Sequence, residues 1–390
     1  MLRERKRERK IVNRLYVLGI FIVLLFAGCN NKGNKNDSDS AVPNASSSIE
    51  LKYAKGFNIS HFDNYTKVAI SNPWSEDGVF VVYYLCKTDS ANVPTDGYKL
   101  QIPIKSIVVN TFSYFEFLKQ LDELDKVKGV TDGFRIYNPE ILDGLKNKTI
   151  VDLGDPFNPN FEKTLAIRPD AIVKSAYTQM DMQNERKINV NIPVIYTLEW
   201  MENSPLARAE WIKLIAAFFD KSTLADSVFN DIEFKYLAKK ESASQLKQKP
   251  TVLSGDSFQG TWYVPGGNSF NAILFNDAGL DYLYKDNSES GSIGLDIETI
   301  LTEFGSAEFW FGCESDSYQE LSNKDSKYML LKSVKNRHVF NNRKRITASG
   351  GNDYFESSIA HPDLLLTDLI KAVQPELVPN EDFTYIQPLK

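Results

Sequence analysis

One unbroken helical pattern in the middle of the chain limits the folds that this sequence can adopt. Residues 223–247 carry apolar side chains at three- and four-residue spacing, and Ser222 just before them is a candidate N-cap. The apolar positions are Ala225, Val228, Phe229, Ile232 and Tyr236. A helix of about 25 residues is roughly 38 Å long, which is the width of a whole domain. The sequence therefore predicts a long helix that connects two separately folded parts.

Strand-like and helix-like segments alternate on both sides of this helix. Before it, we expect strands at 104–109, 127–130, 171–174 and 194–196, with helices at 113–124, 139–145 and 161–167. After it, we expect strands at 251–254, 308–311 and 338–340, with helices at 271–278, 295–304 and 362–373. Such alternation is typical of parallel sheets with covered faces. The expected fold class is α/β, with two lobes that have central, mostly parallel sheets and are joined by one long α-helix.

Residues 49–100 follow a different pattern. The runs at 67–70 and 79–85 are separated by Asn72-Pro73 and Asp77-Gly78, and the second run is β-branched and aromatic. This predicts a small β meander ahead of the lobes. The expected organisation is a signal peptide at 1–28, a flexible tether at 29–48, a β extension at 49–100, an N-terminal lobe at 101–207, an interlobe helical region at 208–249 and a C-terminal lobe at 250–390.

The first residues have the pattern of a secretory signal. A basic segment at 3–10 precedes an apolar run at 15–27, and Ala27-Gly28-Cys29 follows. A cysteine directly after small residues resembles a bacterial lipoprotein signal, in which Cys29 is lipidated and becomes the first mature residue. The alternative is an uncleaved membrane anchor, but this run is shorter than the roughly 20 residues that a span needs. We expect a lipid-anchored protein of the cell envelope that faces the periplasm.

Charge and cysteine content exclude several classes of function. Removal of residues 1–28, whose net charge is +5, changes the formal charge of the chain from −6 to −11. An acidic mature protein argues against nucleic acid as a partner. Cys86 and Cys313 are too few and too far apart for a disulfide framework, so buried thiols are the simpler interpretation. His61, His338 and His361 have no metal-ligand spacing, and no metal site is predicted.

A short pattern occurs once on each side of the long helix. Glu162 and Glu298 each lie in the first turn of a predicted helix, with a leucine three residues later and a strand soon after. Acidic side chains favour helix N-termini in any protein, because they face the positive end of the helix dipole. Their duplication suggests more. The order of these segments, together with 351–356 and 361–369, resembles the iron-siderophore and vitamin B12 periplasmic-binding family, and residues 204–211 look like Bacteroides-type members.

The resemblance implies a receptor function. The chain would capture a metal chelate, namely a ferric siderophore, haem or cobalamin, between its lobes and deliver it to an ABC permease of the inner membrane. Glu162 and Glu298 would contact permease arginines. The resemblance implies a monomer with no catalytic residue and no cofactor. Two alternatives stay open: a chelatase-like enzyme acting on metallo-tetrapyrroles, and a binding lipoprotein that serves an outer-membrane receptor.

Ligand contacts are expected in the loops that follow strands, because ligands of open α/β sheets lie beyond the carboxyl ends of strands. Aromatic side chains recur there and suit large, flat ligands. The acidic net charge weakly favours a corrinoid or another neutral or cationic chelate. The predicted cleft residues are Phe112, Tyr114, Tyr177, Trp200, Trp262, Tyr263, Asn352 and Tyr354.

Overall fold

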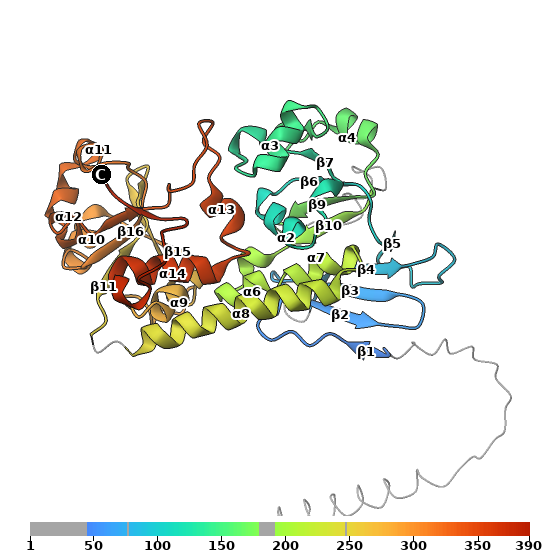
Figure 1. Ribbon diagram of the computed structural model, residues 1–390, viewed down its shortest axis with the longest axis horizontal. Coiled ribbons are helices and arrows are strands. Elements are labelled where there is room, and N and C mark those ends of the chain that lie inside the picture. The colour runs from blue at the N-terminus through green and yellow to red at the C-terminus, as the bar shows by residue number, and fades with distance from the viewer. Residues whose placement is uncertain (1–44, 76–77, 179–191, 246–247) are drawn as a thin grey trace, which may run out of the picture. The chain divides into compact units, whose positions relative to one another are not determined.

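The computed structural model describes residues 45–75, 78–178, 192–245 and 248–390 (Figure 1). The predicted signal peptide, Cys29 and most of the predicted tether lie outside these residues. None of the helices in the described part of the chain is long and apolar enough to span a membrane.

The N-terminal extension is a five-stranded sheet with strand order β1-β2-β3-β4-β5. Its strands are β1 (Ser47–Ser48), β2 (Phe57–His61), β3 (Thr66–Ser71), β4 (Val79–Cys86) and β5 (Tyr98–Gln101). The predicted strands at 67–70 and 79–85 are confirmed as β3 and β4. One face of the sheet packs into the core of the N-terminal lobe, where the Tyr83 hydroxyl donates to the Val194 carbonyl at 2.8 Å. The extension is therefore part of the lobe's hydrophobic core.

The N-terminal lobe has a parallel sheet of order β10-β9-β6-β7-β8. Its strands are β6 (Ile107–Val109), β7 (Val127–Val130), β8 (Val151–Asp152), β9 (Ala171–Ser175) and β10 (Val194–Thr197). Its helical segments are η1 (Phe112–Tyr114), α2 (Phe115–Gln120), η2 (Leu124–Lys126), η3 (Gly133–Arg135), α3 (Pro139–Lys146) and α4 (Phe161–Ile167). The helix predicted at 113–124 is shorter than expected, because Asp122 has a left-handed backbone (φ 58°) that a helix cannot contain.

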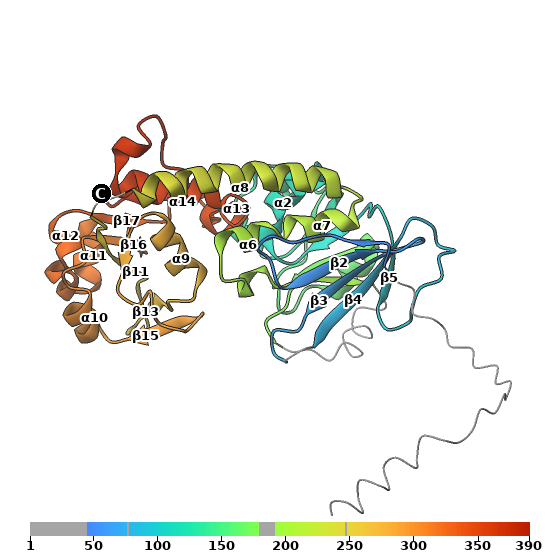
Figure 2. The ribbon, with the colours of Figure 1, turned by 90° about the horizontal axis from the view of Figure 1, so that it is seen from below.

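The connection between the lobes contains η4 (Glu199–Met201), α6 (Pro205–Ala209), α7 (Ile212–Phe218) and the long helix α8 (Ser222–Ser244). Helix α8 confirms the prediction, and it contributes Ala225 and Phe229 to the core of the N-terminal lobe and Tyr236 and Ala243 to that of the C-terminal lobe (Figure 2). The predicted N-cap is wrong. Ser222 lies inside the helix, and the N-cap position belongs to Lys221, whose side chain makes no capping hydrogen bond.

The C-terminal lobe has a sheet of order β14-β11-β16-β17-β18, in which only β18 is antiparallel. These strands are β11 (Thr251–Ser254), β14 (Asp281–Tyr282), β16 (Phe309–Cys313), β17 (Val339–Asn341) and β18 (Gln387–Pro388). A small antiparallel sheet contains β12 (Ser257–Phe258), β13 (Thr261–Pro265) and β15 (Ser292–Leu295).

The helices of this lobe are α9 (Phe270–Asp277), α10 (Ile297–Glu303), α11 (Tyr318–Lys324), η5 (Ser326–Leu330), α12 (Lys332–Lys335), α13 (Asp353–Ser357), α14 (Pro362–Val373) and η6 (Pro375–Leu377). The predicted alternation of strands and helices is confirmed on both sides of α8. Cys86 and Cys313 are buried free thiols, as predicted.

Candidate functional site

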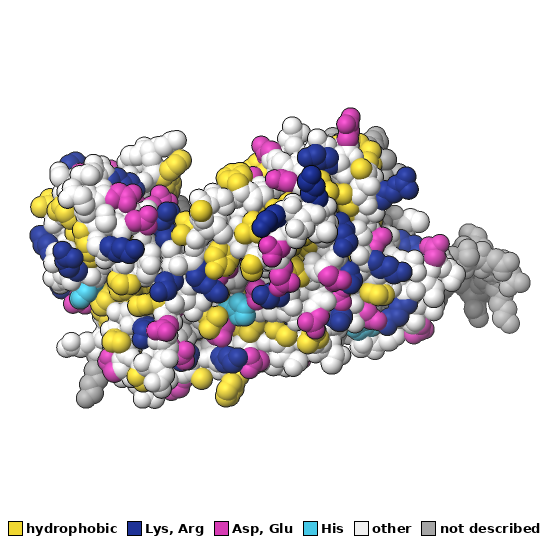
Figure 3. Space-filling view, turned by 45° about the horizontal axis from the view of Figure 1, so that its top comes forward, with side chains coloured by type: hydrophobic (Ala, Val, Ile, Leu, Met, Phe, Trp, Pro, Cys, Tyr) yellow, Lys and Arg dark blue, Asp and Glu magenta, His cyan; other side chains and the backbone are white. Residues whose placement is uncertain are grey.

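Two hollows lie where the strand ends of the N-terminal lobe approach the C-terminal lobe, and the face in Figure 3 is indented between the two lobes. We call the first the strand-end hollow. It has a volume of about 440 Å³ and lies beyond the carboxyl ends of β6, β7 and β9. Its lining includes Asn110, Phe112, Arg135, Phe157, Lys174 and Tyr177. This is the position at which parallel sheets bind their ligands.

Aromatic rings form one wall of the strand-end hollow. The side chains of Phe157 and Tyr177 are 82% and 58% exposed, and their ring centroids lie 6.1 Å apart. The Tyr177 ring also stacks on that of Trp200, with centroids 5.9 Å apart. Burial of such exposed rings against a flat ligand releases water from apolar surface on both partners. The wall is therefore suited to a ligand with an extended apolar or aromatic face.

Polar groups face the same hollow. Arg135 lies with its guanidinium carbon 5.9 Å from the centroid of the Phe112 ring, and it pairs with Asp132 at 3.8 Å. Lys174 supplies a second cation. The buried Asn110 amide oxygen has no hydrogen-bond partner among the described residues. Because an unpaired buried amide is costly, a ligand that bonds to Asn110 gains from satisfying it.

The second hollow, which we call the junction hollow, has a volume of about 250 Å³. Ser113 of the N-terminal lobe, Arg208 of α6 and Phe270 and Tyr354 of the C-terminal lobe contribute to its lining. The Arg208 guanidinium lies 3.7 Å from the centroid of the Phe270 ring and donates to the carbonyls of Trp200 (2.7 Å) and Glu202 (3.1 Å).

Burial at this junction changes the acid–base properties of its side chains. It lowers the pKa of Arg208 to about 10 and raises that of Tyr354 to about 12. Burial also raises the pKa of Glu199, which accepts a hydrogen bond from the Tyr114 hydroxyl at 2.7 Å. Within the described residues, Arg208 has no carboxylate within 4 Å. Its charge is thus available to an anionic group that enters the hollow.

The structure brings three of the predicted cleft residues to these hollows. Phe112 and Tyr177 line the strand-end hollow, and Tyr354 lines the junction hollow. Trp200 lies directly behind Tyr177, where its indole nitrogen donates to the Ala176 carbonyl at 3.0 Å.

Tyr114 and Trp262 are corrections, because both side chains are buried and offer no surface to a ligand. Tyr114 is 0% exposed, and Trp262 is 1% exposed with its ring against those of Trp310 and Tyr328. Alternation along β13 directs Trp262 into the core and Tyr263 outward, where Tyr263 is 45% exposed.

Asn352 has a local structural role: its side chain accepts from the Tyr354 backbone N–H and donates to the Asn342 carbonyl, each at 3.0 Å. Ligand contacts by Tyr263 and Asn352 stay predictions.

Sequence reasoning missed Asn110, Phe157, Lys174 and Arg208 as candidate ligand contacts. The first three lie at or just after strand ends, so the same positional rule would have found them if it had not been limited to aromatic residues after predicted strands. Arg208 lies in a helix, and only the three-dimensional arrangement places it beside Phe270.

The helices with the two predicted docking glutamates have the same local design. In α4, the Asn160 side chain accepts from the Lys163 backbone N–H at 2.9 Å, and in α10 the Asp296 side chain accepts from that of Thr299 at 2.7 Å. Glu162 and Glu298 both lie exposed in the first turn. Glu298 also accepts a hydrogen bond from Lys327 at 2.7 Å, which lowers its pKa.

The histidines are placed far from the hollows or in protein contacts. His61 bonds to Thr66 at 3.0 Å, His338 stacks on Phe309, and His361 pairs with Glu116 at 2.9 Å. The described part of the chain contains no group of three or more His, Cys, Asp or Glu side chains placed to hold a metal ion.

Comparison with known proteins now gives the family. The profile of the periplasmic binding protein family matches residues 107–345, which is more than half of the chain. The chain belongs to the periplasmic binding protein family. The predicted family is therefore confirmed, and its members are solute-binding proteins rather than enzymes.

Two relatives show the range of similar sequences. An uncharacterised lipoprotein of Methanocaldococcus jannaschii is 27% identical over 394 residues, which covers 92% of each chain. The iron-uptake system-binding protein of Bacillus subtilis is 25% identical over 281 residues, which covers 69% of this chain and 81% of that protein.

Solved structures of other periplasmic binding proteins share the fold. The petrobactin-binding protein YclQ of Bacillus subtilis is similar with a TM-score of 0.52 at 19% identity, covering 81% of this chain and 99% of that one. Staphylococcus aureus IsdE complexed with haem gives a TM-score of 0.51 at 17% identity, covering 69% and 98%. The vitamin B12 binding protein BtuF of Vibrio cholerae gives a TM-score of 0.51 at 13% identity, covering 72% and 99%. The two-lobed α/β fold is thus confirmed.

Proposed function

We propose that this protein is the extracytoplasmic receptor of an ABC importer, and that it captures a metal chelate between its lobes. The observation that carries the proposal is the strand-end hollow, where exposed aromatic rings and cationic side chains face one space beyond the carboxyl ends of β6, β7 and β9. The cargo would be an iron chelate, haem or cobalamin. Relatives and structural neighbours that are named for iron uptake, petrobactin, haem and vitamin B12 support this class.

The local charge favours an anionic cargo within that class. The whole chain is acidic, with a formal charge of −6. The two hollows nevertheless contain Arg135, Lys174 and Arg208, against Asp132 as the one acidic residue of their linings. Charges within a few ångströms outweigh the distant net charge, which salt screens over about 8 Å. This argues for chelates with carboxylate or catecholate groups over neutral ones, opposite to the expectation from net charge.

Delivery of the cargo would use the two exposed glutamates. Glu162 and Glu298 lie on different lobes, so a permease that contacts both would sense the lobes together. Lipidation at Cys29 would hold the receptor at the membrane surface, and lipoproteins among the relatives support this location.

Tryptophan fluorescence gives a direct test. We would titrate a soluble form, residues 30–390, with haem, cyanocobalamin and ferric siderophores, because Trp200 stacks on Tyr177 at the hollow and should report occupancy. Saturable quenching by one chelate would support the receptor and identify its cargo. The absence of binding by any of these chelates would contradict the proposal.

A matched pair of phenylalanines localises the site. Phe157 lines the strand-end hollow and is 82% exposed, whereas Phe234 is 74% exposed on α8 and does not line it. Phe157→Ala should weaken chelate binding by about tenfold, as loss of an aromatic contact does at other binding sites. Phe234→Ala should leave affinity unchanged. Equal effects of the two substitutions would place the ligand elsewhere.

A partner in the outer membrane is the remaining alternative to an ABC permease. Uptake that continues after deletion of the inner-membrane permease, and stops after deletion of an outer-membrane receptor, would favour that alternative.

A further inference from the structure

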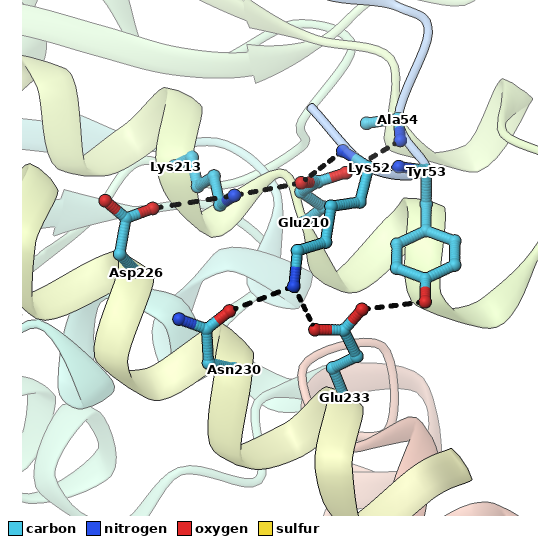
Figure 4. Close-up of polar contacts among 8 residues, drawn as sticks. All are labelled: Lys52, Tyr53, Ala54, Glu210, Lys213, Asp226, Asn230 and Glu233. Carbon is cyan, nitrogen blue, oxygen red and sulfur yellow. Dashed lines mark hydrogen bonds and ion pairs between the residues drawn. The ribbon is translucent and has the colours of Figure 1, made fainter. Parts of the chain in front are cut away.

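The N-terminal extension is fixed to the interlobe region by buried carboxylates. We call residues 52–56 the strap. The Glu210 side chain is fully buried and accepts from the strap N–H groups of Lys52 (3.0 Å), Tyr53 (2.8 Å) and Ala54 (2.9 Å) (Figure 4). It also pairs with the buried Lys213 at 3.0 Å. Charged hydrogen bonds of this kind hold a backbone in one conformation.

The other end of the strap is held in the same way. Glu202 accepts from the N–H groups of Lys55 (2.9 Å) and Gly56 (2.8 Å) and from the Trp211 indole (3.1 Å). A side chain at Gly56 would lie 2.6 Å from the Trp211 ring, so this close approach requires glycine. The strap is therefore a rigid wall, although it lies outside the residues that the family profile matches.

This wall closes one side of a third hollow, which we call the extension hollow. Its volume is about 490 Å³. Three parts of the chain line it: the extension, the interlobe connection and the C-terminal lobe. Its lining includes Tyr53, Lys55, Pro73, Met201, Asn203 and Asn268. A cavity of this size with a mixed lining has the dimensions of a small-molecule site.

Three exposed polar side chains from these three parts line the extension hollow without protein partners. Within the described residues, the side chains of Lys55, Asn203 and Asn268 form no hydrogen bond or ion pair. Glu202 is the one acidic residue of the lining, and three N–H donors already occupy its Oε1. An ammonium and two carboxamides offer N–H donors, which are the groups that bind carboxylate oxygens.

We propose that the extension hollow binds a carboxylate group of a small molecule through Lys55, Asn203 and Asn268. The carboxylate belongs either to an arm of the cargo or to a free organic acid. The first source rests on the proposed receptor function, whereas the second does not. In both cases the extension adds a ligand-selecting wall to the lobes of the binding-protein fold.

Citrate alone tests the second source. Binding of citrate to residues 30–390, without metal, is measured by calorimetry for the wild type and for Lys55→Glu and Asn268→Asp. Each substitution should weaken binding by about fivefold or more, because it places a negative charge against a carboxylate. The control is Lys67→Glu on β3, which makes the same charge change outside the hollow and should have no effect.

Haem and cyanocobalamin test the first source. Haem carries two carboxylates and cyanocobalamin carries none, so Lys55→Glu should weaken binding of haem and spare that of cyanocobalamin. Citrate binding that is sensitive to both substitutions, or haem binding that is selectively weakened, supports the proposal and names the source. Citrate that does not bind, together with unchanged haem affinity, overturns it. If no chelate binds at all, the receptor function fails and the citrate result alone decides.

Discussion

The two lobes carry the same acidic helix start in different surroundings. In α4 and α10 an Asn or Asp caps the helix and a glutamate follows two residues later, exposed in the first turn. In the C-terminal lobe, Lys327 of η5 bonds to Glu298 at 2.7 Å. In the N-terminal lobe, the Glu162 side chain has no such partner among the described residues, and the exposed apolar side chains of Phe161 and Leu165 flank it. Local sequence thus sets the position of each acid, and a distant lysine decides whether it is available.

The lobes also differ in what supports them. The N-terminal lobe shares its core with the extension and holds the strap through Glu210. The C-terminal lobe meets α8 through a simpler contact, in which Asp277 accepts from the Tyr236 hydroxyl at 2.8 Å and pairs with Lys240 at 2.9 Å. The N-terminal lobe is therefore expected to depend on one buried side chain more strongly than its counterpart does.

Removal of these two carboxylates should give the largest difference between the lobes. Glu210→Ala leaves three strap N–H groups and the buried Lys213 without this acceptor, which should cost about 3–5 kcal/mol of unfolding free energy. Asp277→Ala leaves the buried Tyr236 hydroxyl unpaired and should cost about 1–3 kcal/mol. Urea unfolding measures both. An equal or larger cost for Asp277→Ala would contradict the comparison.

The pH dependence of stability should differ between the lobes next. Burial raises the pKa of Glu356, which accepts from the Tyr137 N–H of the N-terminal lobe, to about 7, and that of Asp368 in the C-terminal lobe to about 6. Nearby Asp353 and Glu116 also raise the pKa of Glu356. Because both carboxyl groups bind protons more tightly when folded, their stabilisation is complete at low pH and is lost as pH rises through these values.

Thermal unfolding between pH 5 and pH 8 tests this sign. The wild type should become less stable across the range, and Glu356→Gln should remove up to about 2 kcal/mol of the slope while keeping an acceptor for Tyr137. Asp368→Asn is the counterpart in the C-terminal lobe and should flatten the profile at lower pH. A wild-type profile that rises from pH 5 to pH 8, and that Glu356→Gln does not change, would show that Glu356 is ionised without cost.

Charge reversal of the two exposed glutamates compares the lobes in transport. We expect Glu162→Arg and Glu298→Arg each to reduce uptake by about tenfold without changing chelate affinity, because opposite charges steer and orient partner docking. The loss should be larger for Glu162, since Glu298 already shares its charge with Lys327. Glu303→Arg on α10 is the control. Normal uptake in both variants would exclude these residues as permease contacts.

The smallest effect is expected from Lys327→Ala. This substitution frees Glu298 from its surface ion pair and should strengthen permease binding by about twofold, as exposed pairs are weak. The double variant Glu298→Gln with Lys327→Ala should lose the gain. A decrease in binding after Lys327→Ala would instead assign the lysine itself to the interface.

Periodicity made most of the fold predictable. The spacing of Ala225, Phe229, Ile232 and Tyr236 gave α8, and alternating strands and helices gave the two parallel sheets. Details that depend on local hydrogen bonds were less accessible, such as the start of α8 at Ser222 and the early end of α2. The predicted boundaries between domains stay a prediction.

The candidate site was predictable only in part. The rule that ligands lie beyond strand ends located Phe112 and Tyr177, because chain order fixes which loops meet at that edge of a parallel sheet. It failed for Trp262, because an aromatic residue near a strand end is equally suited to the core and the register of β13 decides its direction. It could not find Arg208, whose position depends on the packing of α6 against α9.

The sequence by itself determined the long helix, the two α/β lobes and the acidic start of α4 and α10, since these depend on spacing along a few turns of chain. The tertiary structure alone decided which glutamate is paired, which aromatic rings are exposed, and that a strap outside the matched family region lies on Glu202 and Glu210. The physical reason is that burial and pairing join residues more than 100 positions apart, as in the bonds between the strap and Glu210, and no local pattern encodes those distances.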